Sequence, residues 1–240
     1  MLGILRFIAF FVFTLTTMFF LVFVRIFSSN MGHILKLRRV YVRIVLWFLG
    51  IKITQTGDAP ALPCIVVSNH RSYLDGILVL KDVLAMPIGK QEVASWPVIG
   101  WGARLSGIIF VDRAAKDSRS QARALATQAL NKGYSVVLCP EGTTSDQAQT
   151  LPFRRGIFDV AAENGFTIVP LAIEYKTLSD AWVGSDTFVP HFLKSFSKPQ
   201  THIKIAYGAP LTNPDGLLLL HEAQQFIDAK LTVFQGEYGR

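Results

Sequence analysis

The sequence predicts an α/β fold, with a single mixed, largely parallel sheet flanked by helices and an N-terminal pair of membrane-associated helices. Two patterns support this prediction. From residue 51 onwards, short apolar runs of strand length alternate with helical segments, which is typical of a sheet covered on both faces. Before residue 51 the chain is apolar and basic, which is typical of helices that bind a membrane. We therefore divide the 240 residues into membrane-docking helices at 1–50 and one α/β domain at 51–240.

The first apolar segment is about long enough to cross a bilayer. Phe7 to Val24 gives 18 residues without a charge, bracketed by Arg6 and Arg25, and about 20 apolar residues span the hydrocarbon layer. This length exceeds the apolar core of a cleaved secretory signal, and no small-residue cleavage site follows it. A second candidate helix, 33–49, is basic in its first half and apolar in its second. Two arrangements fit: a spanning helix followed by an interfacial one, or a hairpin that dips into one leaflet.

The excess positive charge of the chain is confined to the N-terminal segment. Residues 1–57 contain seven basic residues and no acidic one, whereas residues 58–240 contain 17 of each, so the net charge of +7 is entirely N-terminal. Because these cations are interleaved with apolar runs, a membrane is a better partner than a nucleic acid. By the positive-inside tendency and the attraction to anionic lipid, we expect the protein at the cytoplasmic (inner) membrane, with the α/β domain facing the cytoplasm.

The α/β domain is predicted to contain seven strands and five helices. In the first strand apolar and polar residues alternate, as in an edge strand, whereas the second strand is continuously apolar, as in a central one. We expect Ser118 to cap its helix, Gly165 to end another, Pro170 to interrupt the long strand around it, and residues 177–200 to be irregular. The strands are expected at 51–56, 64–67, 86–90, 107–111, 134–139, 167–175 and 202–207, and the helices at 75–80, 98–105, 118–131, 153–163 and 217–231.

A histidine and an aspartate follow the central apolar run Cys64–Val67. His70 is expected where this strand ends, which is the usual place for chemistry in an α/β sheet. On one continuous helix, His70 and Asp75 would lie about 140° apart, so the pair can meet only if the chain turns between them. With His70 on a loop and Asp75 in the first turns of a helix, the carboxylate would accept one ring N–H and leave the other nitrogen free as a base. Taken alone, the pair is weak evidence, because a histidine at a strand end is often only a hydrogen-bonded loop residue.

Three further strand ends carry polar residues that could converge on His70. Parallel strands deliver their carboxyl ends to one edge of a sheet. Lys90 and Arg113 would supply positive charge for a phosphate, and the small turn after Glu141 would bring backbone N–H groups to an anion or a developing oxyanion. Each has a simpler interpretation. Lys90 could be solvated, Arg113 could form a surface ion pair with Asp112, and Glu141 could only cap a turn.

The cysteines and the remaining motifs give no support for a metal site. Cys64 and Cys139 both lie in apolar runs of strand character, and we expect reduced core thiols because disulfides rarely form in a domain that faces the cytoplasm. Neither C-x-x-C nor H-E-x-x-H spacing occurs. The sequence therefore predicts neither a metal ion nor a bound cofactor.

Four motifs, in this order, resemble the 1-acylglycerol-3-phosphate O-acyltransferase (lysophosphatidic acid acyltransferase) family of the bacterial type. They are Asn-His-Arg-Ser-Tyr-Leu-Asp at 69–75, Gly-Ile-Ile-Phe-Val-Asp-Arg at 107–113, Pro-Glu-Gly-Thr at 140–143 and Ile-Val-Pro-Leu-Ala at 168–172. The resemblance implies that 51–240 is a glycerolipid acyltransferase domain. It would transfer a fatty acyl group from acyl-CoA or acyl-carrier protein to the free hydroxyl of 1-acylglycerol-3-phosphate, giving phosphatidic acid, without a metal or a covalent acyl-enzyme.

The resemblance also implies a role for each matched residue. His70 would be the general base that takes the proton from the acceptor hydroxyl, and Asp75 would orient it. The glycerol phosphate end of the acceptor would bind the other predicted site residues, which are Lys90, Arg113, Glu141, Gly142 and Thr143.

One departure from the family pattern bears on the acceptor. Many members have arginine after Glu-Gly-Thr, whereas this chain has Thr144, so one expected phosphate ligand is missing. Lys90, Arg113, Arg154 or Arg155 could compensate, or the acceptor could be lyso-ornithine lipid or another lysophospholipid. Two other functions stay open: a thioesterase or lipase, for which no G-x-S-x-G motif is present, and a non-catalytic lipid-binding membrane protein of the same fold.

Overall fold

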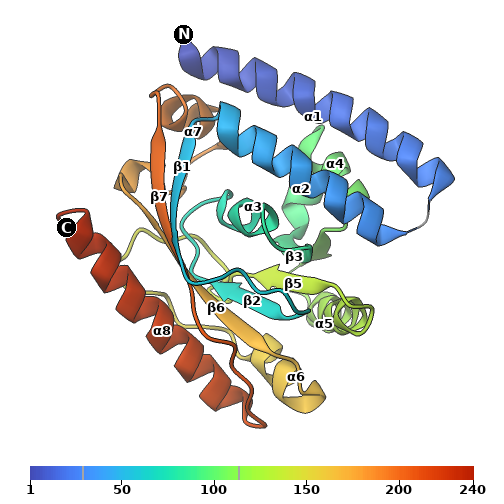
Figure 1. Cartoon of the computed structure of the whole chain (residues 1–240), viewed down its shortest axis with the longest axis vertical. Coiled ribbons are helices and arrows are strands. Elements are labelled where there is room, and N and C mark those ends of the chain that lie inside the picture. The colour runs from blue at the N-terminus through green and yellow to red at the C-terminus, as the bar shows by residue number, and fades with distance from the viewer. Residues whose placement is uncertain (29, 113) are drawn as a thin grey trace.

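A seven-stranded mixed sheet forms the centre of the structure, and helices cover both of its faces (Figure 1). The computed structural model describes residues 1–28, 30–112 and 114–240. In spatial order the strands are β1 (Ile51–Thr56), β7 (Thr201–Tyr207), β6 (Ile168–Tyr175), β2 (Ile65–Ser68), β5 (Ser135–Leu138), β3 (Ala85–Lys90) and β4 (Ile109–Val111). Strands β6, β2, β5, β3 and β4 run parallel, β7 is antiparallel to β6, and β1 pairs parallel with β7. The predicted mixed, largely parallel sheet is confirmed, with β1 at an edge.

Side chains along each central strand alternate between the two faces of the sheet, and both faces are buried. In β2, Ile65 and Val67 pack into one core cluster, whereas Val66 packs into the other. All four residues of β2 and all eight of β6 are buried. A strand covered on both faces needs apolar side chains at nearly every position, which is why these strands stand out as continuous apolar runs in the sequence.

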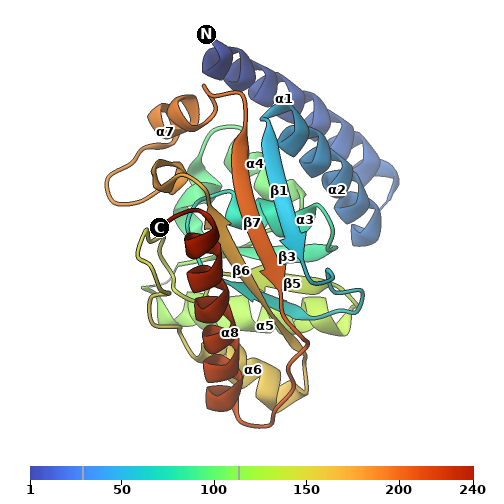
Figure 2. The same cartoon turned by 60° about the vertical axis from the view of Figure 1, so that its left-hand side comes forward.

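Two groups of helices bury the two faces. One face packs against α2 (Met31–Phe48), α3 (Asp75–Leu80) and α7 (Phe188–Ser195). The other packs against α5 (Lys116–Asn131), α6 (Gly156–Asn164) and α8 (Gly216–Glu237), and Figure 2 shows α8 lying across β6. As predicted, α6 ends at Gly165, whose left-handed backbone (φ 68°) suits glycine. The connections contain α4 (Ile99–Leu105) and two short 3₁₀ helices, η1 (Gln91–Ser95) and η2 (Leu178–Asp180).

Three local predictions were wrong. Ser118 does not cap α5, because the helix begins two residues earlier and the Ser118 hydroxyl accepts a hydrogen bond from the backbone N–H of Asp112 (2.8 Å). Pro170 does not interrupt β6, since the ladder to β7 begins only at Leu171 and the missing N–H falls where that pairing ends. Residues 177–200 are not irregular throughout, because they contain α7, whose apolar side packs into the core.

Helix α1 (Leu2–Phe27) lies on the outside of the molecule, on the α2 side of the sheet (Figure 1). It packs against α2, α4 and α7. Near its start, the Arg6 guanidinium donates to the backbone carbonyls of Phe48 (2.9 Å), Lys198 (2.6 Å) and Pro199 (2.9 Å), which fixes this end of the helix to the α/β domain. By length and composition α1 could cross a membrane, and only 17% of its most apolar stretch is buried. Its outer face exposes Leu5, Ile8, Val12, Leu15, Phe19 and Phe23.

Helix α2 is held to the same domain by its basic residues. Arg38 is buried and donates to the backbone carbonyls of Ser106 (2.6 Å) and Ala85. Arg39 donates to the carbonyl of Asp82 (2.8 Å). Part of the basic character of this segment therefore serves to bind loops of the α/β domain, and α1 and α2 form a helical pair docked along it.

Candidate active site

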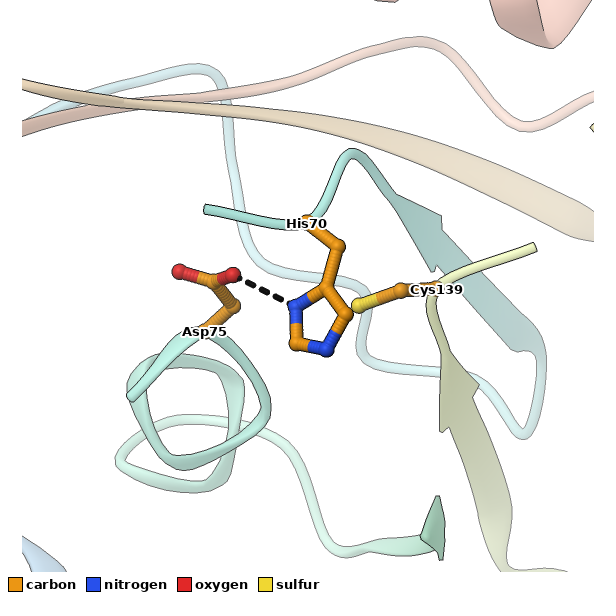
Figure 3. Close-up of side chains that lie close together, drawn as sticks. All are labelled: His70, Asp75 and Cys139. Atoms are coloured by element: carbon orange, nitrogen blue, oxygen red, sulfur yellow. Dashed lines mark hydrogen bonds and ion pairs between the residues drawn. The ribbon is translucent and has the colours of Figure 1, made fainter. Parts of the chain in front are cut away.

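Two strand ends and one helix start bring His70, Asp75 and Cys139 together (Figure 3). His70 lies on the loop two residues after β2, Asp75 is the first residue of α3, and Cys139 directly follows β5. Because β2 and β5 are parallel neighbours, their carboxyl ends lie at the same edge of the sheet. Nδ1 of His70 lies 2.8 Å from Oδ2 of Asp75. The chain therefore makes the turn between loop and helix that this pair requires.

The Asp75 carboxylate is fully buried and accepts hydrogen bonds on both oxygens. Besides His70, Oδ2 accepts from the backbone N–H groups of Arg71 (2.6 Å) and Ser72 (2.7 Å). Oδ1 accepts from the hydroxyl of Tyr175 (2.9 Å). These donors compensate a charge that is removed from water. Because an ionised carboxylate can only accept, it selects the tautomer with hydrogen on Nδ1 of His70 and leaves Nε2 as the basic nitrogen.

The surroundings of His70 make its imidazole a stronger base. Burial favours the neutral ring and acts to lower its pKa. The interactions with the Cys139 sulfur, the hydrogen bond to Asp75 and the negative charge of Asp75 outweigh burial, so the pKa of His70 is raised well above 6.5. Burial, together with the charge of Asp75, raises the pKa of Tyr175 well above 10, so its hydroxyl stays a donor.

Glu141 ties the loop after β5 to the backbone of His70. Its buried carboxylate accepts from the backbone N–H of His70 (2.8 Å) and of Leu151 (3.1 Å). The backbone N–H of Ser145 also donates to the carbonyl of His70 (2.8 Å). Burial raises the pKa of Glu141, and the two hydrogen bonds oppose this rise because they favour the carboxylate. The Glu141 carboxylate thus serves the loop on which His70 sits, and its contact with substrate stays a prediction.

A buried ion pair lies next to this loop. Nη2 of Arg71 lies 3.0 Å from Oε2 of Glu174, with side chains that are 3% and 1% exposed. Arg71 also donates to the carbonyl of Ser145 (2.9 Å), and Arg240 pairs with Glu174 (3.1 Å). These contacts join the His70 loop, the loop after β5 and strand β6 through one charged network.

Cys139 is half-buried and lies against the His70 ring (Figure 3). One atom from each of His70, Asp75 and Cys139 could bind a metal ion, and these three atoms lie within 4.8 Å of one another. Both cysteines are free, but only Cys64 is the buried core thiol that the sequence predicts; for Cys139 that prediction was wrong. Three such groups could hold a metal ion. Because both oxygens of Asp75 already accept hydrogen bonds, the set fits a base with its orienting carboxylate better than a metal centre.

A cavity of about 300 Å³ opens beside Cys139, on the α5 and α6 side of the sheet. Its volume suits a small ligand or the head group of a larger one. Strands β3, β4 and β5 supply apolar side chains to its wall, whereas α5 and the segment before α6 supply arginines. The residues used in the argument below are Arg119, Arg123, Cys139, Gly142, Arg154 and Gly156.

Of the predicted phosphate ligands that the structure describes, only Gly142 lines this cavity. Gly142 lines it and has a left-handed backbone (φ 80°), and Thr143 is exposed on the same turn. Lys90, at the end of β3, is not part of the lining and forms an exposed ion pair with Glu92 (2.9 Å). Arg113 lies outside the described residues.

Several contributors to the site were missed by sequence reasoning. Tyr175 is 100 residues from Asp75, and no local pattern connects the two. Cys139 directly precedes Pro-Glu-Gly-Thr, so its position at a strand end could have identified it. Arg119 and Arg123 are four residues apart on α5, a spacing that places both on one face of a helix.

Comparisons with known proteins identify the family of this chain. A family model described as Acyltransferase matches residues 50–174. The lyso-ornithine lipid O-acyltransferase of Pseudomonas aeruginosa is 30% identical over 199 residues, which cover 77% of each chain. The 1-acyl-sn-glycerol-3-phosphate acyltransferase alpha of Homo sapiens is 33% identical over 146 residues, covering 58% of this chain and 51% of the relative.

A solved structure extends the likeness to the whole chain. The crystal structure of the 1-acyl-sn-glycerophosphate acyltransferase PlsC from Thermotoga maritima superposes with a TM-score of 0.69 at 19% identity. The superposition covers 96% of this chain and 98% of that one, so the two share a fold. From the family match and the relatives in the preceding paragraph, this chain belongs to the acyltransferase family, among members that acylate lysolipids.

Proposed function

We propose that this protein transfers a fatty acyl group from an acyl thioester, either acyl-CoA or acyl-carrier protein, to the free hydroxyl of a lysolipid. The observation that carries the proposal is the pair formed by His70 and Asp75, whose 2.8 Å hydrogen bond leaves Nε2 available as a base. The reaction uses the thioester as its co-substrate and needs no further cofactor.

The proposed chemistry uses His70 first as a base and then as an acid. Nε2 takes the proton of the acceptor hydroxyl while the hydroxyl oxygen attacks the thioester carbonyl. The tetrahedral intermediate collapses, the carbon–sulfur bond breaks, and the imidazolium returns the proton to the leaving thiolate. Asp75 stabilises the transient imidazolium. The products are an ester and a free thiol, so no covalent acyl-enzyme is formed.

We propose lyso-ornithine lipid as the leading acceptor. The relative from Pseudomonas aeruginosa is named for that acceptor, and it aligns over 77% of both sequences. Thr144 stands where the family resemblance predicts an arginine for a phosphate, which also favours a different head group. The second candidate is 1-acylglycerol-3-phosphate, giving phosphatidic acid, because relatives named for that acceptor align over 58% of the chain.

The reaction is proposed to occur at the cytoplasmic face of the inner membrane. The exposed apolar face of α1 and the basic residues of 1–57 support attachment to an anionic bilayer. A lysolipid resides in the bilayer, whereas acyl-CoA and acyl-carrier protein are water-soluble. A catalytic domain docked on the membrane surface would meet both substrates.

The test is an acyl transfer assay with purified full-length protein. Vesicles contain one lysolipid at a time: lyso-ornithine lipid, 1-acylglycerol-3-phosphate or another lysophospholipid. Acyl-CoA or acyl-carrier protein is added, and products are identified by mass spectrometry, with His70→Ala as the matched inactive variant. We expect wild-type protein to acylate lyso-ornithine lipid fastest, and His70→Ala to form almost no product.

Two results would overturn the proposal. Release of free fatty acid without acylated lipid would identify a thioesterase instead. Binding of lysolipid without any product from either donor would identify a non-catalytic lipid-binding protein.

A further inference from the structure

We propose that Arg119, Arg123 and Arg154 form an anion site that binds the acidic group of the acceptor's head. These residues lie outside the four motifs that carry the family resemblance. The inference rests on the proposed function, since it assigns the part of the acceptor that this cavity receives.

The three arginines come from two separate elements and line one cavity. Arg119 and Arg123 lie on α5, and Arg154 lies on the segment that leads into α6. None of the described residues that line the cavity is acidic. Within the described part of the chain, no ion pair to a carboxylate is found for Arg123 or Arg154. A cleft lined by one sign of charge attracts a ligand of the opposite sign.

Two glycines allow the guanidinium groups to come close to the backbone. A Cβ atom at Gly142 would lie 2.8 Å from Nε of Arg154, and one at Gly156 would lie 3.1 Å from Nη1 of Arg123. Gly142 also needs its left-handed backbone (φ 80°), which disfavours any side chain there. The Glu-Gly-Thr turn therefore leaves space for the Arg154 guanidinium next to Gly142.

The backbone adds to the positive potential of the cavity. Gly156 and Ile157 begin α6 and both line the cavity, and among the described residues no side-chain cap is found at this end of the helix. The first N–H groups of a helix carry a partial positive charge, which favours an anion. This contribution supports the three guanidinium groups, which supply the full charges.

Cys139 connects the cavity to the His70 and Asp75 pair. Cys139 lines it, and the Cys139 sulfur lies within 4.8 Å of donor atoms of His70 and Asp75. In both candidate acceptors the acidic group is only a few covalent bonds from the reacting hydroxyl: a carboxylate in lyso-ornithine lipid, and a phosphate in 1-acylglycerol-3-phosphate. Arginine binds either group through the same two-pronged hydrogen bonding.

The test measures KM for acceptor and donor in Arg123→Ala and Arg154→Ala, with lipids in uncharged detergent micelles. The matched control is Arg155→Ala, which removes the same charge from a neighbouring exposed residue that pairs with Asp159 and does not line the cavity. We expect KM for the acidic acceptor to rise about 10- to 100-fold in each cavity variant, as for the loss of a charge-assisted hydrogen bond. The KM for acyl-CoA, and both constants in Arg155→Ala, should stay within about threefold of wild type.

The two acceptors separate the possible sources of the acidic group. A larger rise with lyso-ornithine lipid assigns the site to a carboxylate, and a larger rise with 1-acylglycerol-3-phosphate assigns it to a phosphate. Unchanged acceptor KM in both cavity variants, or a rise confined to acyl-CoA, would overturn the inference while leaving the proposed function intact. If wild-type protein forms no product at all, the proposed function fails; equilibrium binding of the same two lipids to wild type and variants then decides the anion site alone.

Discussion

The charged groups on the two sides of the His70 ring differ in their exposure to solvent. On one side, the Asp75 carboxylate is fully buried and accepts four hydrogen bonds at 2.6–2.9 Å. On the other side, beyond Cys139, the arginines of the cavity are exposed to solvent. The charge that we propose for catalysis is held in one position before substrate arrives, whereas the charges that we propose for recognition remain hydrated until a ligand replaces the water.

This difference follows from what each side has to do. A base and its orienting group must keep one geometry through the reaction. A buried carboxylate is stable only when the fold itself supplies hydrogen-bond donors to it. A recognition site must exchange water for a head group, and exposed arginines do so without leaving a buried charge unpaired. Substitutions on the Asp75 side should therefore change the rate of chemistry, and those on the cavity side should change mainly KM.

The largest effect is expected for Asp75→Asn. An amide supplies no charge to stabilise the imidazolium, and its NH2 group would face donors that need an acceptor, so we expect kcat to fall about 10²- to 10⁴-fold. Acyl transfer kinetics with saturating substrates measure this change, and circular dichroism checks that the variant is folded. A kcat within threefold of wild type would contradict the expectation that substitutions on the Asp75 side change the rate of chemistry.

A smaller effect is expected for Glu141→Gln, which weakens the tie between the loop after β5 and His70. The amide can still accept from one backbone N–H, but its NH2 group cannot satisfy the other. We expect kcat to fall about tenfold and the free energy of unfolding to drop by about 1–2 kcal/mol. Calorimetry and the acyl transfer assay test both parts, and a rise in acceptor KM at unchanged kcat would instead support a direct substrate contact by Glu141.

The smallest effect is expected for Cys139→Ala, at the border between the two sides. The interactions with Cys139 help to raise the pKa of His70, so removal of the sulfur should lower that pKa. The His70 imidazole acts as a base only when it is neutral, so activity should rise with pH through its pKa. The acidic limb of the kcat/KM profile should therefore move to lower pH in the variant. A pH series from 5 to 9, roughly bracketing the histidine range, measures the shift. Complete loss of activity would point to a thiol nucleophile instead.

The fold and the centre of the site could be predicted because their signals are local. Strands buried on both faces are continuous apolar runs, and His70 and Asp75 are five residues apart, so one turn decides whether they meet. The incorrect local predictions arose from tertiary contacts. The Ser118 hydroxyl is used by the backbone of Asp112, and Pro170 is tolerated because the antiparallel ladder ends beside it.

The rest of the site could not be predicted because it depends on distant segments. The partners of Asp75 and Arg71 on β6, Tyr175 and Glu174, are about a hundred residues away, and only the parallel order of β2 and β6 brings them near. The arginine cavity depends on how α5 and α6 pack beside β5, which fixes where Arg123 and Arg154 point. Charge counts alone locate the excess of cations in residues 1–57, far from this cavity in the sequence.

The central claim is that the imidazole of His70 removes the proton of the acceptor hydroxyl. The most direct measurement is the single-turnover rate of acyl transfer by His70→Ala and wild type, made at saturating acyl-CoA and lysolipid after the dissociation constants of both substrates have been measured. We predict unchanged substrate binding and a rate about 10²- to 10⁴-fold below wild type, the usual contribution of positioned acid–base catalysis. A single-turnover rate equal to that of wild type, with substrate bound, would contradict the claim.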